Sequence, residues 1–228
     1  EGRNLIVVDA IHDENLLAIG AAADDLRLVT GGSGVAIGLP ANFAKAGMIS
    51  GVKTEWTGQA GRCAILSGSC SEATRQQIAI HAQTFVQHKI DVAAVMRDQV
   101  DVEQLVGWLL AQGGAPMLYS SASPKLVRVV QAEYGANAVA DKLDRLFGAL
   151  SVALVDAGIE RLIVAGGETS GAVVEALDLR VLSIGPEIDP GVPAMRAGEM
   201  LTLALKSGNF GADNFFEKAA LILAGEKV

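Results

Sequence analysis

The sequence predicts an α/β fold, in which a mostly parallel sheet carries helices on both faces and glycine-rich turns at the carboxyl ends of its strands. Two observations support this prediction. Short apolar runs, typical of buried strands, alternate along the chain with longer stretches of helical character. Several of the runs lead directly into turns of glycine and serine. Ligands of open parallel sheets bind at the carboxyl ends of the strands, so these turns are the first candidates for a site.

The composition is that of a folded domain and disfavours two classes of partner. Of 228 residues, 50% are hydrophobic and 26 are glycine, which excludes a disordered or fibrous chain. The net charge of −8 disfavours nucleic acid and anionic membrane surfaces. No apolar run reaches the roughly 18–20 residues that span a bilayer. We expect a cytoplasmic protein with small-molecule ligands, and a homodimer is compatible with the sequence.

The N-terminal 48 residues predict a small unit of their own. Residues 49–61 are polar, glycine-rich and weakly periodic, which is typical of a linker. Residues 62–228 then form the main domain. The elements expected before the linker are a strand at 5–10, a helix at 13–23 that Asp13 caps, a strand at 28–30, and a helix over 35–46 that Pro40 interrupts.

The main domain repeats a rhythm of strand, turn and helix. Its clearest buried strand is the run Leu162-Ile163-Val164, and its longest helix is a stretch rich in alanine and leucine. A segment over 185–193, rich in proline and glycine, predicts a loop. In chain order we expect strands at 62–66, 90–95, 116–120, 161–165, 180–184 and 201–206, and helices at 72–87, 102–112, 125–134, 138–158, 172–176 and 213–223.

Three turns of this domain share one design and predict an anion site. We call residues 67–71 the first turn, 166–171 the second and 207–211 the third. Glycine lets the backbone approach a ligand closely, and the N–H groups that open a following helix favour an anion. Neither a P-loop nor a Rossmann fingerprint is present. The candidate ligands are Ser67, Gly68, Ser69, Gly166, Gly167, Glu168, Thr169, Lys206, Ser207, Gly208 and Asn209.

Four segments, in order, resemble signatures of the four-carbon acid sugar kinase family. They are 66–71 with Thr74, 164–173, 184–193, and 203–211 with Asp213 and Phe215-Phe216. The segment Gly185-Pro186-Glu187-Ile188-Asp189-Pro190-Gly191-Val192-Pro193 is most similar to the 3-oxo-tetronate kinase branch. The resemblance implies a two-domain enzyme, in which an N-terminal domain binds the acid sugar and a C-terminal domain binds ATP. By this resemblance, ATP contacts Ser67, the turn from Gly166 to Thr169, and Gly208.

The resemblance divides the chain and its functions. Residues 1–48 look like the tail of the acid-sugar domain, with Thr30, Gly31, Gly32 and Ser33 on the substrate side, and 62–228 like the nucleotide domain. The implied reaction is ATP-dependent phosphorylation of a terminal hydroxyl, with 3-oxo-tetronate as the first candidate substrate and threonate or erythronate next. The family's Asp-Asp-x-Thr-Gly segment does not occur here. Two alternatives therefore remain: a nucleotide-binding fragment without turnover, and a flavodoxin-like domain for another anion.

A kinase also requires Mg²⁺, which carboxylates and phosphate oxygens hold together. Glu168 and Asp189 lie beside glycine-rich segments and are the candidate metal ligands. Lys206 precedes the third turn, where it could meet a phosphate as a point charge or be an ordinary lysine at a strand end. The sequence identifies no catalytic base.

Overall fold

The computed structural model describes residues 7–50 and 55–226, and the chain divides into two compact units, residues 1–54 and 55–228. In the first unit, glycines at positions 20 and 38 allow two helices to touch, since a Cβ on Gly20 would lie 2.3 Å from the backbone of Gly38. Within the described residues, no helix has the length and apolarity needed to cross a bilayer. The helices of the first unit are α1 (Asp13–Ala22), the 3₁₀ helix η1 (Ser33–Gly38) and α2 (Leu39–Lys45).

The predicted helices of the first unit are confirmed, but its predicted strands are not. Residues 28–30 have no regular structure, and Leu28 is 83% exposed. So short a segment forms a strand only beside a partner strand, and the described part of this unit offers none. Of the strand expected at 5–10, residues 5 and 6 lie outside the described residues, whereas 7–10 are irregular and exposed.

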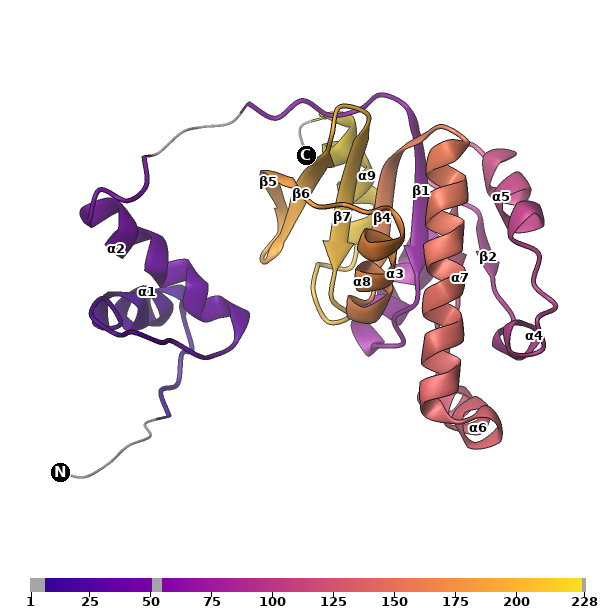
Figure 1. Ribbon diagram of the computed structural model, residues 1–228, viewed down its shortest axis with the longest axis horizontal. Helices are drawn as coiled ribbons and strands as arrows, with labels where there is room; N and C mark the ends of the chain where they lie inside the picture. The colour runs from indigo at the N-terminus through magenta and orange to yellow at the C-terminus, as the bar shows by residue number, and fades with distance from the viewer. Residues whose placement is uncertain (1–6, 51–54, 227–228) are drawn as a thin grey trace. The chain divides into compact units, whose positions relative to one another are not determined.

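The second unit is a seven-stranded sheet with the strand order β2-β3-β1-β4-β7-β6-β5 (Figure 1). Strands β2, β3, β1, β4 and β7 pair in parallel, whereas β6 pairs antiparallel with both of its neighbours, β7 and β5. The predicted mostly parallel α/β fold is thus confirmed. The strands are β1 (Arg62–Ser67), β2 (Gln87–Lys89), β3 (Met117–Tyr119), β4 (Ile159–Ala165), β5 (Ser183–Asp189), β6 (Val192–Ala197) and β7 (Leu201–Lys206). The helices are α3 (Glu72–His81), α4 (Val92–Met96), α5 (Val102–Leu110), α6 (Pro124–Tyr134), α7 (Ala136–Asp156), α8 (Gly167–Ala176) and α9 (Phe215–Ala224).

The central strands of the sheet are buried on both faces, and their successive residues belong to two separate cores. In β1, Ala64 and Leu66 belong to the core beneath α5, α7 and α8, and Cys63 and Ile65 belong to the core beneath α3 and α9. Figure 1 shows α7 and α8 in front of the sheet and α3 and α9 behind it. Burial on both faces explains why these strands read as continuous apolar runs rather than alternating ones.

The segment 90–95 was expected to be a strand and is not. The strand is β2, which ends at Lys89, and α4 begins at Val92. Asp91 starts that helix, because its carboxylate accepts a hydrogen bond from the Ala93 N–H at 2.9 Å. A short apolar run cannot by itself distinguish a strand from a buried helix. The preceding helix, expected to reach residue 87, ends at His81, which leaves room for β2.

The loop expected over 185–193 is a β-hairpin made by β5 and β6. Gly191 forms its turn with a φ of +78°, a conformation that favours glycine. The Glu187 carboxylate accepts a hydrogen bond from the Gly191 N–H at 2.7 Å. The prolines that suggested a loop are tolerated, because the pairing is irregular around Glu187. The strand expected at 180–184 accordingly begins only at Ser183.

Asp189 ties this hairpin to the helix α9 behind the sheet. Its side chain is only 5% exposed and accepts a hydrogen bond from the Ala212 N–H at 2.9 Å. Its other carboxylate oxygen forms an ion pair with Lys218 of α9. Both oxygens are therefore engaged within the protein.

We predict that Asp189→Asn lowers the free energy of unfolding by about 1.5–3 kcal/mol, the usual value of a hydrogen bond to a charged group. Lys218→Met should also destabilise the chain, because it leaves the Asp189 charge buried and unpaired. Chemical denaturation of both single variants and the double variant measures their coupling.

The exposed pair between Arg180 and Asp178 serves as the control, and Arg180→Met should change stability by less than about 0.5 kcal/mol. If the losses in unfolding free energy of the Asp189 and Lys218 variants were strictly additive, the proposed interaction between the two residues would be contradicted.

Candidate functional site

The three glycine turns lie side by side because the strands that precede them are neighbours, paired in the order β1-β4-β7. Backbone hydrogen bonds continue past the strand ends. The N–H groups of Gly68 and Ser69 donate to the Ala165 carbonyl at 2.9 and 3.1 Å, and the Gly166 N–H donates to the Lys206 carbonyl at 2.9 Å. The predicted convergence of the turns at one edge of the sheet is therefore confirmed.

Hydroxyl groups hold the first turn in place. The Ser121 hydroxyl donates to the Ser69 carbonyl at 2.5 Å and lies 3.2 Å from Ser67 Oγ. A hydroxyl has one proton to donate, so Ser67 is the donor to Ser121. Ser71 caps α3 by accepting from the Thr74 N–H at 3.2 Å. Ser121 was not predicted from the sequence, because it reaches the turn from the end of another strand.

Thr169 fills the space between the first and second turns, and glycine is required on both sides of it. A Cβ on Gly68 would lie 2.1 Å from Thr169 Oγ1, and a Cβ on Gly166 would lie 2.9 Å from it. Gly166 also has a φ of +128°, which other residues rarely adopt. Thr169 is 5% exposed. Its packed side chain therefore sets the distance between the two turns.

The second turn opens directly into α8, which begins at Gly167 rather than at residue 172 as expected. No side chain caps this helix. The N–H groups of Gly167, Glu168 and Thr169 have no partner within the helix, and the helix dipole places positive potential there. The start of α8 is therefore available to an anionic ligand.

The third turn packs against the first. The Gly208 carbonyl oxygen lies 2.6 Å from Ser71 Oγ and 2.8 Å from Thr74 Oγ1. Lys206 Nζ reaches the same carbonyl at 3.1 Å and Thr74 Oγ1 at 2.9 Å, and it also donates to the Ser207 carbonyl at 3.2 Å. Lys206 is 1% exposed, and burial lowers its pKa from 10.5 to about 8. Its ammonium group thus binds protein oxygens at the base of the turns.

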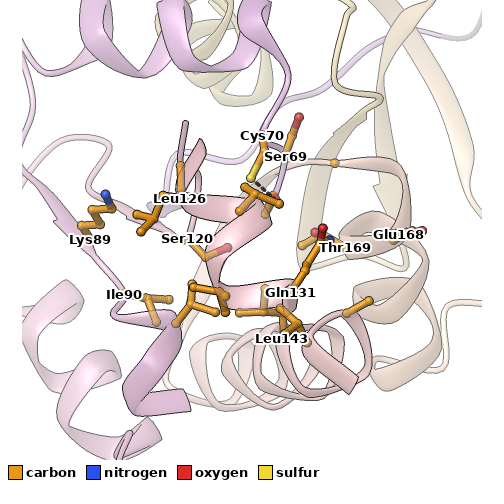
Figure 2. Close-up of a pocket in the computed structure, with 18 of the residues that line it drawn as sticks. Ser69, Cys70, Lys89, Ile90, Ser120, Leu126, Gln131, Leu143, Glu168 and Thr169 are labelled. Carbon is orange, nitrogen blue, oxygen red and sulfur yellow. Dashed lines mark hydrogen bonds between the residues drawn. The ribbon is translucent and has the colours of Figure 1, made fainter. Parts of the chain in front are cut away.

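A pocket of about 680 Å³ opens beside the first two turns (Figure 2). One part of its wall is polar backbone and small side chains, contributed by residues 68–70 and 166–169. Five of the candidates, Ser67, Lys206, Ser207, Gly208 and Asn209, are not among its lining residues, and Ser67 is fully buried. The third turn therefore supports the first turn rather than the wall of this pocket.

The other part of the pocket wall is mainly apolar, with Lys89, Asp91 and Gln131 as its polar residues, and was not predicted from the sequence. It comes from the segment that leads into α4, from Ala122 after β3, and from α6 and α7. The apolar spacing within α6 gave a helical signal, but nothing in the sequence showed that this helix would face the glycine turns. The apolar slot is lined by Ile90, Val92, Ala93, Ala122, Leu126, Val127, Val130, Val139, Ala140 and Leu143.

The acidic candidates differ in their surroundings. Glu168 is exposed and lines the pocket. It also acts on Asp144 of α7, whose pKa is raised by burial first and then by the negative charges of Glu168 and Asp141. Asp189 does not line the pocket, and Lys218 and the Ala212 N–H occupy its oxygens. No group of three or more metal-ligating side chains occurs in residues 7–50 and 55–226.

The residues expected on the substrate side belong to the first unit. Thr30, Gly31 and Gly32 are exposed in an irregular segment, and Ser33 begins η1. Backbone N–H groups and two hydroxyls are the polar groups they offer.

Known proteins resemble this chain over nearly its whole length. Residues 64–216 match the family of nucleotide-binding C-terminal domains. The chain is 43% identical to a 3-oxo-tetronate kinase of Pseudomonas fluorescens over 99% of its own length and 53% of that protein's. A 3-oxo-tetronate kinase of Salmonella typhimurium is 40% identical, over 96% of this chain and 53% of that protein.

A solved structure supports the same relationship. The Haemophilus influenzae protein HI1011 superimposes with a TM-score of 0.75 and 34% identity, over 95% of this chain and 53% of that one. The chain spans about half the length of the curated relatives it matches, 53% for the two kinases above. The profile match and these relatives show that the chain belongs to the four-carbon acid sugar kinase family, with residues 64–216 in its nucleotide-binding C-terminal domain.

Proposed function

We propose that the pocket binds ATP and that the chain provides the nucleotide-binding part of a kinase for a four-carbon acid sugar. One observation carries this proposal: a single cavity joins two glycine turns, the second of which opens α8 without a side-chain cap, to an apolar slot. ATP has two matching parts, an anionic triphosphate and a flat adenosine. The family description and the names of the relatives support the kinase over a flavodoxin-like domain for another anion.

In this proposal the triphosphate lies against residues 68–69 and the start of α8, and the adenosine enters the apolar slot. The third turn does not contact the nucleotide but supports the first turn, since Lys206 and Gly208 form hydrogen bonds with the hydroxyls of Ser71 and Thr74. Lys206, Ser207 and Asn209 then affect the phosphates through the placement of the first turn. Phosphoryl transfer depends mainly on such positioning and on charge neutralisation.

Mg²⁺ fits the pocket with Glu168 as its protein ligand. The first turn of α8 carries this carboxylate at the pocket wall, where it would repel a triphosphate unless a cation lay between them. Mg²⁺ commonly takes one or two carboxylates and completes its shell with phosphate oxygens and water. We do not extend this role to Asp189, whose oxygens are engaged by α9 and the Ala212 N–H.

The proposed reaction transfers the terminal phosphoryl group of ATP to the terminal hydroxyl of 3-oxo-tetronate, with threonate and erythronate as the next candidates. Residues 62–228 serve as the nucleotide domain, 49–61 as the linker, and 1–48 as the tail of the acid-sugar domain. The exposed segment from Thr30 to Ser33 would contact the sugar. The relatives' names favour turnover over a nucleotide-binding fragment that lacks it.

Gly167→Ala should weaken ATP binding without destabilising the protein. No protein atom lies within 4 Å of a Cβ at this position, so the new methyl group points into free space of the pocket wall. Overpacking against a bound phosphate costs about 1–3 kcal/mol, which corresponds to a loss of about 5-fold to 150-fold in affinity. Isothermal titration with MgATP, together with thermal unfolding of the free chain, measures both effects.

Gly171→Ala is the matched control on the same helix, since it also has open space but does not line the pocket. It should leave ATP affinity unchanged. Absence of ATP binding by the unsubstituted chain would refute the nucleotide site itself.

Glu168→Gln should have opposite effects on the binding of MgATP and of metal-free ATP. The substitution removes a ligand of Mg²⁺ and also removes a negative charge that repels metal-free ATP. We expect weaker binding of MgATP and tighter binding of ATP in EDTA than in the unsubstituted chain, as measured by titration. Glu175→Gln, at the far end of α8, should change neither affinity. Equal losses with and without Mg²⁺ would exclude Glu168 as a metal ligand.

The chain should release ADP when it is given MgATP and an acid sugar. A coupled ADP assay with 3-oxo-tetronate, threonate and erythronate should give the highest kcat/KM for 3-oxo-tetronate. Gly167→Ala should lower this rate, whereas Gly171→Ala should not. A chain that binds ATP yet releases no ADP above background with any of the three would be a nucleotide-binding module without turnover.

A further inference from the structure

Ser120 lies where the two parts of the pocket meet. Its backbone N–H donates to the Ser67 carbonyl at 2.9 Å, which places it beside the first turn. On its other side, the Ile90 N–H donates to the carbonyl of the preceding residue, Tyr119, at 2.8 Å. Ile90 belongs to the apolar slot, so Ser120 stands between the slot and the glycine turns.

Successive side chains after β3 point in different directions. Ser120 and Ala122 line the pocket, whereas Ser121, between them, does not. Ser121 instead bonds to the first turn through Ser67 and Ser69. This alternation is the one expected of extended backbone, and it directs the Ser120 side chain to the pocket side, as Figure 2 shows.

The Ser120 hydroxyl is buried and has no hydrogen-bond partner among the described residues. The side chain belongs to a residue that is 3% exposed. Of the buried side-chain atoms without a partner in the described part of the chain, Ser120 Oγ is the one whose residue lines the pocket. A buried hydroxyl left unpaired is costly, and each such group calls for an explanation.

We infer that Ser120 pairs with the nucleoside part of the bound nucleotide and so contributes to its recognition. The inference rests on the proposed function. A nucleoside is the part of ATP that would occupy the apolar slot while presenting ring nitrogens and ribose oxygens. A serine hydroxyl can rotate to donate or to accept, so it can complete a hydrogen bond with either kind of group.

This role gives Ser120 opposite effects on folding and on binding. In the free chain its hydroxyl is an unpaired buried group, so its removal should not destabilise the fold. In the complex the same removal leaves a polar atom of the nucleoside without its partner. A residue that served the fold alone would lower stability when it was truncated.

The test compares Ser120→Ala with the unsubstituted chain in two measurements. Thermal unfolding of the free chain should give an equal or higher midpoint for Ser120→Ala. Titration should show ATP binding weakened about fivefold to tenfold, the usual effect of one lost hydrogen bond. Inorganic tripolyphosphate, measured as a competitor of ATP, should bind both chains equally, because it lacks the nucleoside.

Ser121→Ala is the contrasting variant. It releases the first turn, so it should lower the unfolding midpoint and weaken ATP and tripolyphosphate together. If Ser120→Ala is insoluble, Ser120→Gly removes the same hydroxyl and replaces it in every measurement.

The outcomes separate this inference from the proposed function. If the unsubstituted chain does not bind ATP, the proposed function fails. If it binds ATP and Ser120→Ala binds equally tightly, only the role of Ser120 is overturned. A lower midpoint for Ser120→Ala, with ATP and tripolyphosphate weakened in parallel, would assign Ser120 to the support of the turn.

Discussion

Hydrogen bonds that run past the ends of β1, β4 and β7 fix the position of everything in the pocket's polar wall. The Ala165 carbonyl accepts from Gly68 and Ser69, and the Lys206 carbonyl accepts from Gly166. These bonds align the backbone of three turns that are far apart in the sequence. They also require parallel neighbours, because only parallel strands bring their carboxyl ends to one edge. The sheet order is therefore the condition on which the proposed anion site depends.

Side chains then lock the aligned turns at a fixed spacing. Thr169 fits between Gly68 and Gly166 so closely that a methyl group on Gly68 would overlap it. Ser121 and Thr74 add hydroxyl contacts from two other elements. In the proposed site, rigid turns of this kind would bind a phosphate without losing further conformational freedom. The apolar slot, in contrast, is formed by the helices α4, α6 and α7, which pack against one another, together with Ile90 and Ala122. Two separate parts of the fold therefore supply the two halves of the pocket.

The burial of each charged residue near the turns decides whether it stabilises the fold or remains available to a ligand. Lys206 and Asp189 are almost fully buried and bind protein groups, namely turn oxygens for Lys206 and α9 for Asp189. Glu168 is exposed at the pocket wall. Burial of an unpaired charge is costly, so buried ions find partners within the chain, and exposed ones remain available to a ligand. Proximity in the sequence to a glycine turn does not reveal this difference.

The sequence by itself determined the α/β class, the central strands and the three turns. Its local signals were strong there: β1 and β4 are continuous apolar runs, and glycine follows each of them. It misjudged 90–95 and 185–193, where short apolar or glycine-rich segments suit more than one structure and the pairing partner decides. Only the tertiary structure brought Ser120, Ser121 and the apolar slot to the turns. Ser121 lies 54 positions after Ser67, and the slot residues come from several separate segments between Ile90 and Leu143. Contacts between such segments are set by the packing of the sheet and its helices and not by local pattern.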